Sequence, residues 1–248
     1  MQLSVSATII TLNEEANIER CLNSLQWAAE VVVVDSGSTD RTLEICQVFG
    51  ARVVRTPWLG FGRTKQLAVE HASNDWIFSI DADEQVSPEL EAQIKKVFSG
   101  QPEFNAYHIQ RLSHYLGKPI RHCGWDRDRP LRLFRKDTGV FNDKPVHESV
   151  EVDCETSLLS GPLLHYPYPS VFSHLEKMNR YTELAADEAV TAGKRATPMG
   201  ATLRGVVKFF KMFILQSGFL DGRIGWALAK NSAFGVYLKY LKIWQKSL

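Results

Sequence analysis

Cysteine pairs, long apolar runs and internal repeats are missing from this chain of 248 residues. Its four cysteines, Cys21, Cys46, Cys123 and Cys154, are scattered and form no CxxC pair, which disfavours a zinc knuckle or a disulfide framework and favours reduced thiols. No apolar run approaches the ~20 residues that a membrane-spanning helix needs. No basic and then apolar leader precedes the first strand-like segment, so we expect the protein to remain in the cytosol.

Acidic residues are almost absent from the end of the chain, although the chain as a whole is nearly neutral. Residues 201–248 contain eight lysines and arginines and a single acid, Asp221, a net charge of +7, whereas residues 1–200 carry −6. Hydrophobic residues make up 44% and charged residues 23% of the chain, which is typical of globular proteins and excludes a disordered chain. The positive charge of residues 201–248, the basic region, predicts a second function that involves an anionic partner.

The first hundred residues alternate between strand-like and helix-like segments. Strands are expected at 5–12, 31–34, 52–55 and 76–80, and helices at 15–25, 40–49 and 63–72. This rhythm predicts an α/β fold with a mostly parallel central sheet and helices on both faces. We expect one domain over 1–198, with halves at about 1–100 and 101–198, and a basic, amphipathic helical region over 199–248.

Two carboxylates, Asp81 and Asp83, directly follow the strand expected at 76–80. Residues two apart in extended backbone share a side, so both carboxylates can face one hard cation, Mg²⁺ or Mn²⁺. The alternatives are a solvated acidic turn and an EF-hand. The EF-hand fails, because Val86 stands where its loop needs glycine and Ala92 where it needs glutamate.

A second polar cluster, residues 33–40, follows the strand expected at 31–34. The strand delivers Asp35 to the edge of the sheet, where its carboxylate can accept a hydrogen bond from a base N–H or a ribose hydroxyl. Gly37 permits a tight turn. The alternative is helix capping, for which Asp40 is better placed.

Three ordered motifs, residues 8–15, 33–40 and 79–84, resemble those of glycosyltransferase family 2, the inverting enzymes with the Rossmann-like GT-A fold. The resemblance covers roughly residues 1–165. The stretch from 132–135 through 146–148 is similar to lipopolysaccharide core glucosyltransferases, which add glucose to an inner-core heptose.

This resemblance implies a nucleotide-sugar donor, UDP by family default, in the first half and a saccharide acceptor in the second. Leu12, Glu14 and Asp35 would contact the nucleoside. Asp81 would face the ribose or a divalent cation, and Asp83 would bind the cation.

Three further residues are donor-side candidates. Arg63 and Lys65 open the helix expected at 63–72 and would neutralise a diphosphate; the alternative is an ordinary solvated first turn. His165 ends an apolar run late in the second half. It would complete the metal shell, as a late histidine does in some GT-A enzymes, or it is a buried structural histidine.

Inversion requires a base that takes the acceptor hydroxyl proton as that oxygen attacks the anomeric carbon. The resemblance points to Glu148 as this base. The runners-up are Asp126 and Asp128, which are flanked by arginines and would otherwise form a surface ion-pair cluster.

The basic region predicts two amphipathic helices. One apolar stripe consists of Leu203, Val206, Val207, Phe210, Phe213 and Ile214, and the other of Phe234, Tyr237, Leu238, Leu241 and Trp244. Basic amphipathic helices suit an anionic membrane surface, where a lipid-linked acceptor would reside. The alternative is that both helices pack on the rest of the protein. The acidic body disfavours nucleic acid as the partner.

The sequence thus predicts an inverting, metal-dependent transferase that moves a hexose from a UDP-sugar to a lipopolysaccharide inner-core acceptor, working as a peripheral protein at the inner face of the cytoplasmic membrane. A polyprenyl-phosphate sugar transferase and a non-catalytic nucleotide-sugar-binding scaffold are the alternatives. A nucleotidyltransferase is disfavoured, because it would need a glycine-rich basic loop where this chain has 13–15, Asn-Glu-Glu.

Overall fold

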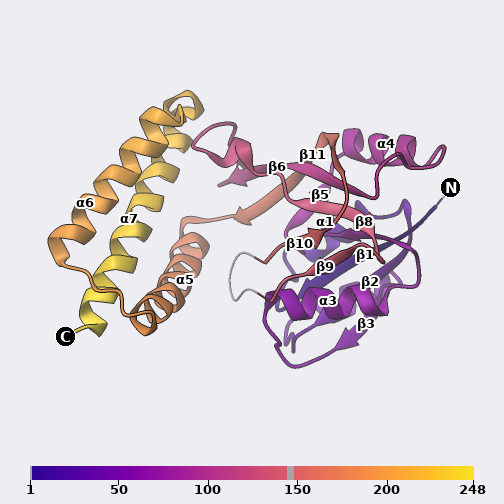
Figure 1. Cartoon of the computed structure of the whole chain (residues 1–248), viewed down its shortest axis with the longest axis horizontal. Coiled ribbons are helices and arrows are strands. Elements are labelled where there is room, and N and C mark those ends of the chain that lie inside the picture. Colours follow the sequence, from indigo (N-terminus) through magenta and orange to yellow (C-terminus); the bar gives the residue numbers. More distant parts are fainter. Residues whose placement is uncertain (1, 144–147) are drawn as a thin grey trace. The chain divides into compact units, whose positions relative to one another are not determined.

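The computed structural model describes residues 2–143 and 148–248, which divide into two compact units (Figure 1). Unit 1 contains the chain up to Arg111 together with Arg129–His165. Unit 2 contains Leu112–Asp128 and Tyr166–Leu248.

Four parallel strands form the first part of the large sheet. They are β1 (Leu3–Thr11), β2 (Ala28–Asp35), β3 (Arg52–Arg55) and β4 (Trp76–Ser79), in the spatial order β3-β2-β1-β4. Side chains of the two inner strands, such as Val5, Ala7 and Val33, are fully buried. Continuous runs of β-branched and other apolar residues are typical of parallel strands covered on both faces. Each of these strands lies where the sequence predicts one.

Helices link the parallel strands. They are α1 (Ile18–Asn23), α2 (Thr42–Val48), α3 (Phe61–His71) and, after β4, α4 (Pro88–Val97). The N-cap residue of α2 is Arg41 rather than Asp40, the cap expected from the sequence, and Asp40 accepts a hydrogen bond from the backbone N–H of Thr42 at 3.0 Å. Helix α4 has proline in its first turn, and Ser87 Oγ accepts the N–H of Leu90 at 3.1 Å.

Further strands extend the sheet beyond β4. They are β8 (Leu131–Arg135), β6 (Ala106–Tyr115), β11 (Thr156–Tyr168) and β5 (Glu84–Val86), and β9 (Gly139–Phe141) pairs with β10 (Val150–Val152) in a small second sheet. Strands β6 and β11 run on into unit 2. The predicted α/β fold class is confirmed: β3, β2, β1 and β4 pair in parallel, and β8 is antiparallel to both of its neighbours, β4 and β6.

The carboxyl ends of β1, β2 and β4 meet at one edge of the sheet. Thr11 in β1 pairs with Asp35 in β2, and Thr8 pairs with Ser79 in β4. The segments that follow these three strands therefore converge, as expected for a ligand site in an open α/β sheet.

Unit 2 is largely helical. Its helices are α5 (Val171–Thr191), α6 (Pro198–Phe210), the π-helix η2 (Lys211–Leu215), the 3-10 helices η1 (Trp125–Arg127) and η3 (Gly218–Asp221), and α7 (Gly222–Lys246). A short strand, β7 (Lys118–Pro119), pairs with β6. Helix α7 packs against both α5 and α6. The core contains Tyr115, Cys123, Met212 and Leu228.

The helical C-terminal region predicted from the sequence is present, as α6 and α7. The boundary expected between residues 198 and 199 lies inside unit 2, because α7 packs on α5 as well as on α6. The division of function between 1–198 and 199–248 stays a prediction. Among the helices that the structure describes, none is both long and apolar enough to cross a membrane.

Candidate active site

A buried lysine joins two carboxylates in unit 1. Lys65 Nζ lies 2.7 Å from Asp81 Oδ1 and 2.8 Å from Glu148 Oε1. Its side chain is only 7% exposed, so the ammonium depends on these two partners. Burial would lower the pKa of Lys65, but the charges of Asp81 and Glu148 and the hydrogen bond to Asp81 together outweigh it, and the pKa is raised. Lys65 therefore stays ionised and holds the two carboxylates together.

Two arginines and a buried glutamate fix Asp81 from its other side. Arg132 Nη2 lies 2.6 Å from Asp81 Oδ2 and 2.7 Å from Glu84 Oε1. Arg111 Nη1 lies 2.9 Å from the same Glu84 oxygen. Glu84 is fully buried, and its Oε2 accepts the backbone N–H of Asp81 at 2.9 Å. Glu84 thus anchors both the loop and the arginines.

The electrostatics of this cluster favour ionised groups. Burial alone would raise the pKa of Asp81, but the charges of Arg132 and Lys65 hold it well below its usual range. Burial would lower the pKa of Arg132, but the charges of Asp81 and Glu84 raise it. Within the ranges that the structure describes, the buried Nε of Arg132 has no hydrogen-bond partner. The cluster is a fixed arrangement of charges beside the sheet edge where β1, β2 and β4 end.

Asp83, directly before β5, and His165, in the neighbouring strand β11, come together. His165 pairs with Glu84 in the antiparallel register, and its Nε2 lies 3.5 Å from Asp83 Oδ2. Two ligands that bind one divalent cation at about 2.1 Å each stand about 3–3.5 Å apart, so this pair fits a cation.

Both carboxylate oxygens of Asp81 form ion pairs, Oδ1 with Lys65 and Oδ2 with Arg132. Among the described residues no group of three histidine, cysteine or acidic side chains is arranged to hold a metal. A cation here would thus take few protein ligands and find the rest in water and substrate oxygens, as Mg²⁺ does beside nucleotide phosphates.

Asp35 is fully buried at the end of β2 and shapes the turn that follows. Its Oδ1 accepts the backbone N–H groups of Gly37 and Ser38, both at 3.0 Å, and Thr11 Oγ1 donates to its Oδ2 at 3.1 Å. A cavity of about 230 Å³ adjoins this turn. It is lined by Asp35, Gly37, Ser38, Leu43, Arg55, Thr56 and Pro57.

The turn after β1 is fastened to the turn after β2. Asn13 has a φ of 57°, and its Oδ1 accepts the N–H of Thr39 at 2.8 Å. The backbone N–H of Glu14 donates to Thr42 Oγ1 at 2.8 Å. Leu12 is 46% exposed in this turn. The two predicted nucleoside contacts, Leu12 and Glu14, therefore lie beside the turn that holds Asp35.

The first turn of α3 separates its two basic residues. Arg63 is exposed, whereas Lys65 is buried in the carboxylate cluster. Gly62, which precedes Arg63, has no room for a side chain. A Cβ at this position would lie 1.9 Å from the backbone oxygen of Asn142. The missing side chain lets α3 pack against the segment that leads toward Glu148.

Some predicted residues fall outside this cluster. Asp126 and Asp128 belong to unit 2, with Asp126 in η1, whereas Asp81, Lys65 and Glu148 belong to unit 1. Of the 146–148 motif, Val146 and His147 lie outside the described residues.

Three residues of the cluster, Glu84, Arg111 and Arg132, were not predicted as site residues. Arg132 carried a usable signal: it interrupts an apolar strand, Leu131-Arg132-Leu133-Phe134. A charged side chain in a buried strand needs a charged partner.

Comparison with known proteins places this chain in a family. Residues 6–141 match the family model described as Glycosyl transferase family 2. An uncharacterized glycosyltransferase of Rickettsia bellii (strain RML369-C) is 34% identical over 98% of this chain and 87% of its own length. The chain therefore belongs to glycosyltransferase family 2, which confirms the predicted family.

A named relative and two solved structures are also similar. The lipopolysaccharide core biosynthesis glycosyltransferase LpsC of Rhizobium meliloti (strain 1021) is 31% identical, over 99% of this chain and 93% of LpsC. S. aureus TarS in complex with UDP-GlcNAc has a TM-score of 0.49 at 16% identity, covering 96% of this chain and 82% of that one. Glucosyl-3-phosphoglycerate synthase from Mycobacterium tuberculosis, with Mn²⁺ and UDP, has a TM-score of 0.40 at 22% identity, covering 54% and 57%.

Proposed function

We propose that this family 2 glycosyltransferase moves glucose from a UDP-sugar to a heptose of the lipopolysaccharide inner core, with inversion at the anomeric carbon. The observation that carries the proposal is the link between Asp81 and Glu148 through Lys65, which joins a donor-side acid to the expected acceptor-side acid. The similarity to LpsC supports a lipopolysaccharide core acceptor.

Glu148 is the general base in this proposal. Its carboxylate takes the proton of the acceptor hydroxyl while that oxygen forms the new bond to the anomeric carbon. The bond from the anomeric carbon to the β-phosphate oxygen breaks on the opposite face, and UDP leaves with the electron pair. Lys65 holds Glu148 in place through the 2.8 Å ion pair. Asp126 is the alternative base.

Asp83 and His165 are the proposed protein ligands of a divalent cation, Mg²⁺ or Mn²⁺, with Asp81 facing the ribose or the cation. The cation supplies positive charge beside the diphosphate when it is bound. The 3.5 Å separation of the Asp83 and His165 atoms supports this assignment. Arg63, exposed on the first turn of α3, adds positive charge beside the diphosphate in this proposal.

The nucleoside lies in this proposal against the turns after β1 and β2. Asp35, Leu12 and Glu14 contact it, and the cavity of about 230 Å³ beside Asp35 takes the base. The acceptor is a lipid-linked saccharide, so the enzyme works at the inner face of the cytoplasmic membrane.

A thermal-shift panel tests the donor. UDP, GDP, CDP and ADP are added with and without Mn²⁺ to the wild type and to Asp83→Ala. Ligand at ~100 times its dissociation constant adds about 2.7 kcal/mol, or roughly 5–10 °C for a chain of this size. We expect a shift with UDP that needs the metal and disappears in Asp83→Ala. No shift with any nucleotide would contradict the proposal.

A further inference from the structure

Helix α6 leaves one of its faces exposed. Five apolar residues on it are exposed, with Leu203 at 64% and Phe210 at 56%. In a regular helix of 3.6 residues per turn they fall within an arc of about 100°. The opposite face, with Ala201 and Gly205, is buried. The exposed apolar residues of α6 are Met199, Leu203, Val206, Val207 and Phe210.

Exposed apolar residues continue beyond α6. The exposed apolar residues of η2 and η3 are Ile214, Leu215, Phe219 and Leu220. An apolar side chain exposed singly is normal on a protein surface, but nine in 22 consecutive positions (199–220) mark an interaction surface.

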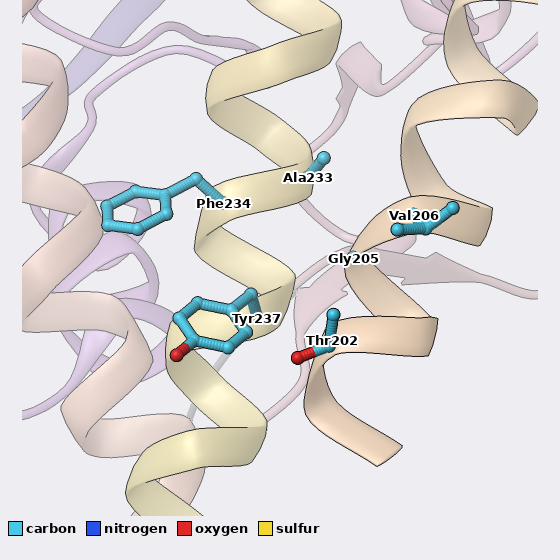
Figure 2. Close-up of a pocket in the computed structure, with 6 residues that line it drawn as sticks. All are labelled: Thr202, Gly205, Val206, Ala233, Phe234 and Tyr237. Atoms are coloured by element: carbon cyan, nitrogen blue, oxygen red, sulfur yellow. The ribbon is translucent and has the colours of Figure 1, made fainter. Parts of the chain in front are cut away.

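A hollow of about 230 Å³ widens the apolar surface toward α7. Figure 2 shows that its lining residues come from α6 and α7. Val206 belongs both to the exposed face of α6 and to this hollow. On the other helix, Phe234 is 45% exposed and lines the same hollow. The apolar surface therefore spans two helices.

Positive charge flanks one side of the apolar face. Arg204 and the half-buried Lys208 follow the apolar arc in the helical rotation, on the side away from Val206, and the exposed Lys211 begins η2. The only acid in residues 201–248 is Asp221, whose side chain is 7% exposed and accepts hydrogen bonds from the backbone and ring of His122. The basic flank is thus not offset by an exposed acid from this region.

The second basic stripe predicted from the sequence is used inside unit 2 instead. Lys242 Nζ lies 2.9 Å from Glu183 of α5, and Lys246 Nζ lies 2.7 Å from Asp187 of the same helix. Ile243 between them is 2% exposed. These lysines hold α7 on α5.

We propose that the face formed by α6, η2 and η3 docks the protein on a bilayer that contains anionic phospholipid. Apolar side chains enter the boundary between headgroups and acyl chains, and the flanking cations meet lipid phosphates. The docking proposal rests on the proposed membrane location of the enzyme. It does not depend on which nucleotide-sugar donor the enzyme uses or which sugar it transfers. Charge complementarity favours a bilayer over a second copy of this chain, because two copies would bring like basic flanks together.

Binding of the full chain to vesicles tests the docking surface. The vesicles are phosphatidylcholine with or without phosphatidylglycerol. We expect the wild type to sediment only with the anionic vesicles, and Leu203→Glu or Phe210→Glu to lower the partition coefficient about tenfold or more each. The matched control is Val48→Glu, at an apolar position on α2 of unit 1 that is 79% exposed, which should bind as the wild type does.

The cations give an independent test. Lys211→Gln should weaken binding to anionic vesicles about fivefold, and added salt should weaken the wild type. Lys242→Gln should leave vesicle binding unchanged, because that lysine pairs with Glu183. A larger loss in Lys242→Gln than in Lys211→Gln would overturn the assignment to α6.

Other results also decide the proposal. Wild type that stays unbound at low salt, or Phe210→Glu that binds fully, would overturn it. So would a lipid-free dimer that Phe210→Glu converts to a monomer. Circular dichroism checks folding, and Leu203→Ser replaces any glutamate variant that unfolds. A metal-dependent UDP thermal shift, measured on the same samples, reports the proposed function separately, so either proposal can fail while the other stands.

Discussion

The ammonium of Lys65 lies 2.8 Å from the carboxylate of Glu148, although 83 positions separate them in the chain. Helix α3 and the segment before β10 must be correctly packed for this pair to form. Lys65 also contacts Asp81, so the same buried ammonium group joins the donor-side and acceptor-side acids of the candidate site.

Removing the ammonium group of Lys65 should destabilise the protein. Lys65→Met keeps most of the side-chain volume but leaves Glu148 without the ammonium and Asp81 with its arginines alone. We expect a loss of about 2–3 kcal/mol in the free energy of unfolding, somewhat below the usual cost of breaking a buried pair, because the carboxylates are partly exposed. Urea denaturation measures it. Arg63→Met, exposed on the same turn, should change stability by less than about 0.5 kcal/mol; equal losses in both would contradict the structure.

The depressed pKa of Asp81 predicts how its contribution depends on pH. Its folded pKa lies well below the ordinary value of about 3.9, so the stabilisation is fully present above pH ~4 and is lost as the pH falls through the folded pKa. The difference in unfolding free energy between wild type and Asp81→Asn should therefore be largest near neutral pH and shrink below pH ~4. A difference that grows on acidification would show that the ion pairs do not form.

Gly62 should tolerate no side chain. A Cβ at this position would meet the backbone oxygen of Asn142 at 1.9 Å, so Gly62→Ala must displace α3 from that segment. We expect a loss of about 1–3 kcal/mol in thermal or urea unfolding. Gly100→Ala is the control, because its Cβ meets nothing within 4 Å. Equal stability of the two variants would mean that α3 does not pack as described.

The cation site can be tested apart from turnover. His165→Ala and Asp83→Ala should each weaken Mn²⁺-dependent UDP binding, about tenfold or more, because each removes one of two proposed protein ligands. Isothermal titration in Mn²⁺ and in chelator measures it. Unchanged affinity in His165→Ala would leave that histidine a structural role beside Asp83.

Much of unit 1 was predictable, because its signals are local. Runs of β-branched residues marked β1 and β2, and the polar segments after them fell at the expected edge of the sheet. Asp35 and Asp81 were found by this rule. The pairing of Lys65 with Glu148 was not, since nothing in the spacing of residues so far apart shows that a buried ion pair joins them.

The same limit applies to the other missed features. Glu84 looked like the end of an acidic turn, yet it is fully buried beneath two arginines. The α6 and α7 stripes look alike in sequence, but the lysines beside the α7 stripe, Lys242 and Lys246, form ion pairs with α5. Tertiary packing, which amphipathic periodicity does not encode, decides such cases.

Glucosyl transfer by a Glu148→Gln variant is the most direct test of the whole account. Purified wild type, Glu148→Gln and Asp126→Asn are given UDP-glucose, Mn²⁺ and an inner-core acceptor, and product is followed by mass spectrometry alongside UDP affinity. The account predicts transfer by the wild type, a loss of about 10²–10⁴-fold in Glu148→Gln with UDP affinity retained, and a much smaller loss in Asp126→Asn. Near-normal transfer by Glu148→Gln, or loss confined to Asp126→Asn, would contradict it.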